Sequence, residues 1–164
     1  MLGAASEPTI GQSGGSAREA SLTSPSRAVP ILVVEDDPRY CEAIGRALES
    51  VPLRPFAVHT GAAALRFLAH PSPDAPRPAF VVLDFNLPDA NAPAVLTDLR
   101  ADPGSHDIPV LVLTQIPGAA DERAALDAGA QAYHAKPSRA AALRELLLDF
   151  WRTHVGPYGD PDRR

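Results

Sequence analysis

Along this chain, short apolar runs alternate with stretches in which apolar residues recur every three or four positions. The runs are too short for helices and rich in β-branched residues, which is typical of strands buried on both faces of a sheet. Four of the runs are strongly apolar, and the second is weaker. The predicted strands cover residues 31–34, 54–59, 79–84, 109–114 and 130–135.

Each predicted strand is followed by a segment with the periodicity of a helix. The first helix has Asp37 as its N-cap and Pro38 as its first residue, and Pro52 stops it. The other helices are predicted to open at Thr60-Gly61, at Pro93, at about Ala119 and near Ser138. Strands that alternate with helices in this way predict an α/β fold with a doubly wound parallel sheet of five strands.

Length and composition agree with a single globular domain, since the chain has 164 residues and 45% of them are hydrophobic. A net charge of −5 gives no basic footprint for nucleic acid. No apolar run approaches the roughly 20 residues of a membrane span, so we expect no membrane partner. The single cysteine, Cys41, excludes an internal disulfide and fits a reducing compartment, so we expect a cytoplasmic protein with a buried structural thiol.

The two ends of the chain differ in composition from its middle. Residues 1–28 are rich in Gly, Ser and Ala and show neither a helical nor a strand period, so they are predicted to be disordered. Residues 29–155 form the predicted domain, and residues 156–164 are predicted to be a flexible tail.

Four of the predicted strands end in residues that carry chemistry. These residues are the acidic pair Glu35 and Asp36, then Asp84, Thr114 and Lys136. The carboxyl ends of parallel strands share one edge of the sheet, where ligands bind in open α/β folds. Clustered carboxylates repel each other unless a cation joins them, and Mg²⁺ suits a few carboxylates combined with phosphate oxygens. A hydroxyl and an ammonium at the same edge favour a phosphoryl group as the remaining ligand, and a carboxylate can itself accept that group.

Lysine usage points to the same edge. Lys136 is the only lysine in the chain, whereas the other basic residues are arginines. A compact ammonium acts as a point charge, while a guanidinium is a wide planar fork. Retention of one lysine therefore indicates a site in which a guanidinium would not fit.

Together, these residues resemble the receiver domain of two-component response regulators over about residues 29–153, which implies a flavodoxin-like receiver fold. The resemblance implies that Glu35 and Asp36 are the acidic metal-binding pair and that Asp84 is the phosphoacceptor. It also implies that Asp84 and the backbone carbonyl of Asn86 complete the Mg²⁺ site.

The same resemblance assigns switch roles to three further residues. Thr114 corresponds to the switch hydroxyl, Lys136 to the lysine that neutralises phosphoryl charge, and Tyr133 to the aromatic residue that turns inward on activation. The bond between Lys136 and Pro137 corresponds to a peptide bond that is often cis in this family. Gln115 departs from the small residue usual there, so we expect it to crowd or hydrogen-bond the phosphoryl group and alter its lifetime.

A narrower resemblance covers residues 83–88 and 148–155, which look like stand-alone receivers paired with bacterial phytochrome kinases. It implies a histidine kinase as partner, with a phytochrome as its sensor, and a downstream protein that the sequence does not name. Few residues follow Lys136, so we expect no output domain after it. The protein is then expected to be a phosphoacceptor that signals through a changed protein-binding surface, and not a true enzyme.

Two other classes of function compete with this interpretation. A small magnesium-dependent phosphohydrolase would use a similar sheet, but this chain has Asn86 where such an enzyme needs a second acid two residues after Asp84. An interaction module with a silent site would not need the full residue set. Phosphorylation by acetyl phosphate with Mg²⁺ separates the three.

The last predicted helix carries a second apolar stripe beside its core-facing one. Leu148, Trp151 and Val155 form this stripe, which the helical period rotates toward solvent in a monomer. Monomers rarely leave such a strip uncovered, so we expect a homodimer that buries it. A tail that folds back with Pro157 and Tyr158 as cover is the alternative.

Overall fold

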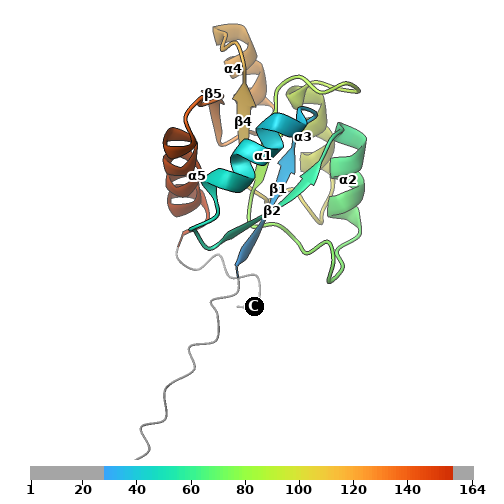
Figure 1. Ribbon diagram of the computed structural model, residues 1–164. Helices are drawn as coiled ribbons and strands as arrows, with labels where there is room; N and C mark the ends of the chain where they lie inside the picture. The colour runs from blue at the N-terminus through green and yellow to red at the C-terminus, as the bar shows by residue number, and fades with distance from the viewer. Residues whose placement is uncertain (1–27, 157–164) are drawn as a thin grey trace, which may run out of the picture.

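A single parallel sheet with strand order β2-β1-β3-β4-β5 organises the computed structural model, which describes residues 28–156 (Figure 1). The strands are β1 (Val29–Val34), β2 (Leu53–Val58), β3 (Val81–Asp84), β4 (Val110–Thr114) and β5 (Ala132–Ala135). The helices are α1 (Pro38–Ala47), α2 (Gly61–Ala69), α3 (Ala92–Ala101), α4 (Ala119–Asp127) and α5 (Ala140–His154). All neighbouring strands pair in parallel, so the predicted α/β fold is confirmed.

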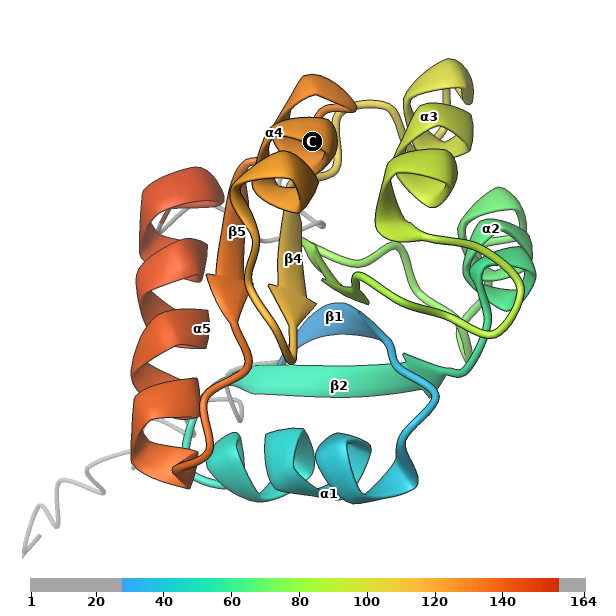
Figure 2. The ribbon, with the colours of Figure 1, turned by 90° about the horizontal axis from the view of Figure 1, so that it is seen from above.

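Side chains of the central strands alternate between two cores, one on each face of the sheet. Ile31 and Val33 of β1 belong to the core beneath α1 and α5, whereas Leu32 and Val34 belong to the core beneath α2, α3 and α4. Figure 2 shows α1 and α5 on one side of the sheet and the other three helices on the opposite side. Both faces are therefore dry, which explains why the strand is apolar at every position.

Several element boundaries differ from the prediction, among them the end of α1 and the start of β5. Helix α1 ends at Ala47 and does not extend to Pro52, because the chain after it continues as turns, in which the N–H of Glu49 donates to Arg46 and that of Val51 to Leu48. Strand β5 begins at Ala132 and not at residue 130, because Gly129 turns the chain with a φ of 106°. A Cβ atom at that glycine would lie 2.8 Å from Nε of Arg100, so this position also needs the absence of a side chain.

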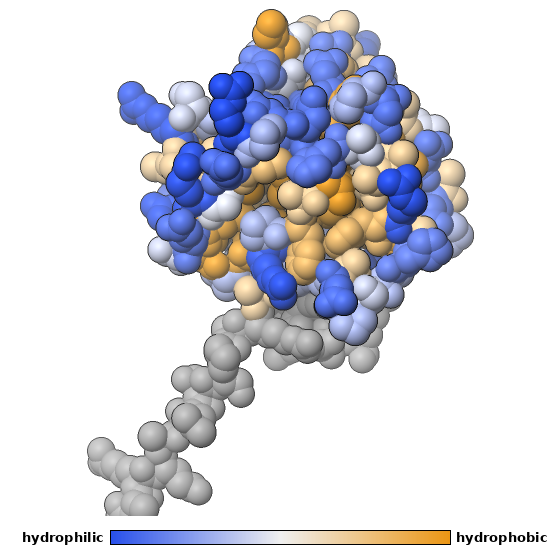
Figure 3. All heavy atoms as spheres, turned by 45° about the vertical axis from the view of Figure 1, so that its right-hand side comes forward, coloured by the Kyte–Doolittle hydropathy of each residue, from blue (hydrophilic) through white to orange (hydrophobic). Residues whose placement is uncertain are grey.

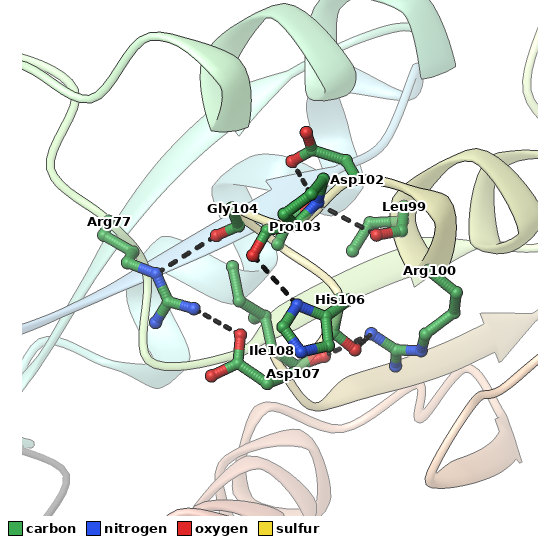
Figure 4. Close-up of polar contacts among 10 residues, drawn as sticks. Arg77, Leu99, Arg100, Asp102, Pro103, Gly104, His106, Asp107 and Ile108 are labelled. Atoms are coloured by element: carbon green, nitrogen blue, oxygen red, sulfur yellow. Dashed lines mark hydrogen bonds and ion pairs between the residues drawn. The ribbon is translucent and has the colours of Figure 1, made fainter.

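Arg100 holds the edge of the sheet that lies opposite the functional strand ends. Its guanidinium donates to the carbonyl oxygens of His106 at 3.0 Å, Ile108 at 2.9 Å and Gly129 at 2.7 Å. Figure 4 shows Arg100 with His106 and Ile108, beside the ion pair of Arg77 with Asp107. Burial lowers the pKa of Arg100, but these carbonyls satisfy its donors. The network holds in place the segments that lead into the N-terminal ends of β4 and β5.

The surface mixes hydrophilic and hydrophobic side chains, as Figure 3 shows for one face. Within residues 28–156, the exposed large hydrophobic residues are Ile116 and Leu126, at 82% and 42% exposure. None of the described helices is long and apolar enough to cross a membrane. The disorder predicted at the amino end and the flexible tail concern residues 1–27 and 157–164, which lie outside the described part.

Candidate functional site

Strand β1 delivers two acidic side chains to the carboxyl edge of the sheet. Glu35 is 3% exposed, and its Oε1 accepts a hydrogen bond from the backbone N–H of Asp37 at 3.1 Å. Asp36 follows it and is exposed. The third acid, Asp37, caps α1 by accepting the N–H of Arg39 at 2.9 Å. Two carboxylates thus remain for a ligand, while the third starts the helix.

Asp84 joins this pair because β3 lies beside β1 in the sheet. Its side chain is almost buried, and carboxylate oxygens of Glu35, Asp36 and Asp84 lie within 4.8 Å of one another. Three acids at this spacing repel each other in the absence of a cation. Oxygen donors of this kind suit Mg²⁺, so the structure assembles the carboxylates that the strand ends predicted.

The ammonium of Lys136 lies against two of these carboxylates. Its Nζ is 2.6 Å from Oε2 of Glu35 and 3.3 Å from Oδ2 of Asp84, and only 4% of its side chain is exposed. The backbone N–H of Lys136 donates to the carbonyl of Thr114 at 2.7 Å, next to the last pairing of β4 with β5. The only lysine of the chain therefore lies at the functional edge with a nearly buried side chain.

Burial dominates the electrostatics of Glu35. It raises the pKa of this carboxyl above its ordinary value, and the negative charge of Asp84 adds to the effect. The hydrogen bond from Lys136 opposes the rise without cancelling it. One ammonium is thus shared by two nearly buried acids, which leaves excess negative charge at the site.

The switch residues Thr114 and Tyr133 both hold the loop between β4 and α4. Thr114 is 2% exposed, and its hydroxyl donates to the carbonyl of Ile116 at 3.4 Å. The Tyr133 hydroxyl accepts the N–H of Gly118 at 3.2 Å, directly before α4. The loop is therefore attached to β4 through one hydroxyl and to β5 through the other.

Tyr133 already points inward in this structure, and the rotation expected on phosphorylation stays a prediction. Tyr133 is already 8% exposed, and its ring meets the edge of Phe85 with centroids 6.0 Å apart, while Thr114 still bonds to the loop. The Phe85 contact and the Gly118 hydrogen bond together stabilise the inward position. The expectation of a cis bond is wrong, because Lys136–Pro137 is trans and residues 28–156 contain no cis peptide bond.

Asn86 opens the loop between β3 and α3. Its backbone N–H donates to Oδ1 of Asp84 at 3.4 Å, so the loop begins next to the acids. Further along the loop, Asp89 accepts the N–H groups of Gly61 and Ala62 at 2.9 Å each, which ties the loop to the start of α2. These hydrogen bonds lower the pKa of Asp89, and sequence patterns give no signal for the contact. Gln115 is exposed at the end of β4, and its predicted effect on a phosphoryl group stays a prediction.

Side chains of His59 and Cys41 also contact Glu35. The backbone carbonyl of Glu35 accepts a hydrogen bond from Nδ1 of His59 at 2.8 Å and a weak one from Sγ of Cys41 at 3.6 Å. Burial raises the pKa of the Cys41 thiol, which agrees with a structural and not a reactive cysteine. The two contacts hold the end of β1 in place.

Tyr40 is the residue of the site that sequence reasoning missed. The helical period predicts it only as part of the apolar stripe of α1. In the structure its ring lies beneath Lys136, with Nζ 4.8 Å from the ring centroid. Its role depends on how α1 is placed relative to Lys136, which lies far away in the sequence, and no local pattern encodes that.

The predicted dimer stripe lies on α5 but is less exposed than the helical period indicates. Leu148, Trp151 and Val155 are each partly buried and pack against the core that α1 and α5 share. Contacts between α1 and α5 therefore cover part of the stripe within one copy. The exposed area of this stripe does not by itself require that a second copy of the chain cover it.

Comparison with known proteins gives a consistent family. The sequence profile described as "Response regulator receiver domain" matches residues 31–148. The curated response regulator MprA of Mycobacterium ulcerans is 38% identical over 120 residues, which cover 73% of this chain and 47% of that protein. The chain thus spans about half the length of the curated relatives it matches.

Solved structures agree in fold. The phosphorylated cyanobacterial phytochrome response regulator RcpA aligns with a TM-score of 0.67 and 27% identity, covering 77% of this chain and 93% of RcpA. The receiver domain of the sensor histidine kinase PA1611 from Pseudomonas aeruginosa, solved with a magnesium ion in its active-site cleft, aligns with a TM-score of 0.65 and 27% identity. That alignment covers 79% of this chain and 98% of the PA1611 domain.

Proposed function

Because the chain belongs to the response regulator receiver domain family, we propose that Asp84 accepts a phosphoryl group from a histidine kinase. The P–N bond of a phosphohistidine on the kinase breaks, and a P–O bond forms at the Asp84 carboxylate. The observation that carries the proposal is the position of Asp84, which lies beside the acidic pair that follows β1 and 3.3 Å from the Lys136 ammonium. A nearly buried carboxylate with both a cation-binding pair and a fixed positive charge suits an anionic reactant.

The donor set fits Mg²⁺ because it offers hard carboxylate oxygens in a cluster with excess negative charge. We propose that Glu35, Asp36 and Asp84 hold the ion together with the backbone carbonyl of Asn86. When bound, Mg²⁺ supplies neutralisation of charge on the phosphoryl oxygens. Asp36 has the exposed carboxylate of the set, so a ligand can reach it without unfolding the site.

Lys136 and Thr114 are proposed to stabilise the product. The Lys136 ammonium can exchange its longer contact, with Asp84, for a phosphoryl oxygen while it keeps the shorter one with Glu35. The Thr114 hydroxyl can donate to a phosphoryl oxygen only by leaving the carbonyl of Ile116. That exchange removes the contact of Thr114 with the loop before α4. The hydrogen bond between Gly118 and Tyr133 then remains as the other contact of the loop. The proposed signal is therefore a change in this loop, next to the exposed Ile116.

The likeness to the phytochrome response regulator RcpA supports a bacterial phytochrome as the sensor kinase. The receiving partner is a downstream protein that reads the changed surface. We also propose that residues 29–155 act as the functional unit, and that two copies associate through Leu148, Trp151 and Val155.

Phosphorylation of Asp84 is tested by intact mass after incubation with acetyl phosphate and Mg²⁺. The wild type should gain about 80 Da in a form labile to hydroxylamine, as expected for an acyl phosphate. Asp84→Asn should lose this gain, and Asp98→Asn, at an exposed position of α3, should keep it. Full modification of Asp84→Asn would refute the assignment.

A further inference from the structure

The surroundings of the Lys136 ammonium are unusual because one side is aromatic. Glu35 and Asp84 contact Nζ at 2.6 and 3.3 Å, and the ring of Tyr40 lies 4.8 Å from it. The ammonium therefore lies among two anions and the negative face of a π-system. Only 4% of the lysine side chain remains exposed.

We propose that Tyr40 is a positioning residue for Lys136: its ring holds the ammonium at the phosphoacceptor through a cation–π contact. A lysine side chain has a long flexible stem. Ion pairs with two carboxylates keep the ammonium near them, but the stem can still reach them from more than one direction. The ring adds a third boundary and confines Nζ to the edge of the sheet where β1, β3 and β5 end. This role rests on the proposed function of Asp84.

The ring, and not the hydroxyl, carries the proposed role. The Tyr40 hydroxyl oxygen is buried and has no hydrogen-bond partner among the described residues. Burial, together with the charges of Glu35 and Asp84, raises the pKa of this phenol, so it stays protonated near neutral pH. Phenylalanine would present the same face to Lys136, whereas leucine would fill part of the space without a π-system.

The contact between Tyr40 and Lys136 matters most during phosphoryl transfer to Asp84, when negative charge develops on the phosphoryl oxygens. At that stage Lys136 changes partner from the Asp84 carboxylate to a phosphoryl oxygen, and a lysine free to swing into solvent would lose the transition-state contact. A ring that stays in place limits this loss, since cation–π attraction strengthens where water is excluded.

The contact itself can be observed without phosphorylation, because Lys136 is the only lysine of the chain. Labelling with ¹³C-lysine gives one set of side-chain NMR signals if any purification tag lacks lysine. The Hε protons should be shifted upfield by the ring current in the wild type and in Tyr40→Phe. The shift should disappear in Tyr40→Leu, or in Tyr40→Met if the leucine variant does not fold. An Hε shift unchanged in the aliphatic variants would overturn the contact.

The functional role is measured as the rate of phosphorylation by acetyl phosphate with Mg²⁺. Tyr40→Leu should react about threefold to tenfold more slowly than the wild type, as expected for loss of one desolvated cation–π contact. Tyr40→Phe should react at the wild-type rate. The control is Phe56→Leu, which removes the matching pair of Arg54 over Phe56, also at 4.8 Å, on the edge strand β2.

The outcomes separate this inference from the proposed function. A lost ring-current shift with an unchanged rate in Tyr40→Leu would overturn the positioning role. Equal slowing in Tyr40→Phe would assign the role to the hydroxyl and would also overturn it. If the wild type itself were not phosphorylated, the proposed function would fail and the role with it, while the NMR signal would still report the contact.

Discussion

At the scale of single residues, Glu35 shows how the site favours a cation. Its carboxylate is nearly buried, pairs with an ammonium that Asp84 also uses, and has a raised pKa because of burial. A buried carboxylate with a raised pKa lowers the stability of the folded protein whenever it is charged. A bound divalent cation would remove that penalty by favouring the charged form.

We therefore predict that the contribution of Glu35 to the free energy of unfolding depends on pH differently with and without Mg²⁺. The pKa of Glu35 is higher in the folded chain than its ordinary 4.5, so its contribution to the free energy of unfolding is full below pH 4.5. This contribution is lost as the pH rises through the folded pKa. Added Mg²⁺ should abolish or reverse the loss. The measurement is urea unfolding near pH 5 and pH 7, in EDTA and in Mg²⁺.

The contribution of Glu35 is the difference between the wild type and Glu35→Gln under the same conditions. The glutamine variant should lose the part of the pH slope that depends on Mg²⁺. Glu49→Gln, at an exposed position after α1, should retain it. A pH slope that is identical in Glu35→Gln and the wild type would contradict the interpretation.

At the scale of elements, Asp89 joins the loop after β3 to the start of α2. Its carboxylate accepts two backbone N–H groups that α2 leaves unpaired at its N-terminus. A Cβ atom on Gly61 would lie 2.7 Å from Cγ2 of Val95, so α2 approaches α3 closely at the same place. The loop that presents Asn86 is thus attached to a rigid part of the fold.

Asp89→Ala should lower both the melting temperature and the affinity for Mg²⁺, because the loop that carries Asn86 loses its attachment. Thr60→Ala is the matched control. It removes the N-cap of the same helix, where the threonine Oγ1 accepts the N–H of Ala63 at 3.1 Å, at a cost of about 1 kcal/mol. Calorimetry should show weaker Mg²⁺ binding for the Asp89 variant only. Equal affinities in the two variants would show that the contact serves stability alone.

At the scale of the whole molecule, the sequence predicts the alternating strands and helices along the chain. It does not predict contacts between side chains of elements that are distant in the sequence. Apolar strands ending in Glu35, Asp84 and Lys136 identify the sheet, its functional edge and most of the site, because strand ends follow from chain order. Tyr40 and Asp89 escape prediction because their partners come from elements distant in the sequence. The inward position of Tyr133 also escapes, since a rotamer depends on neighbours such as Phe85 and Gly118.

The proposed homodimer also concerns the whole molecule, and the partly buried stripe of α5 bears on how it can be tested. The stripe of Leu148, Trp151 and Val155 already packs in part against its own core, so association through it buries less new area than a fully exposed stripe would. Ile116, in the loop before α4, and Leu126, on α4, are exposed apolar residues that offer a competing place for association. The two surfaces can be separated because they lie on different elements.

We expect the wild type to sediment as a dimer at micromolar concentration and Trp151→Glu to sediment as a monomer, because a buried carboxylate opposes association through α5. Trp151 also contacts the core, so Val155→Glu, at the end of α5, serves as the second variant if the first does not fold. Leu126→Glu is the matched control on α4 and should remain dimeric. A monomeric wild type, with or without a phosphoryl group, would end the proposal. A dimer that dissociates only in Leu126→Glu would place the interface on α4, since the stripe of α5 would then be covered by its own chain.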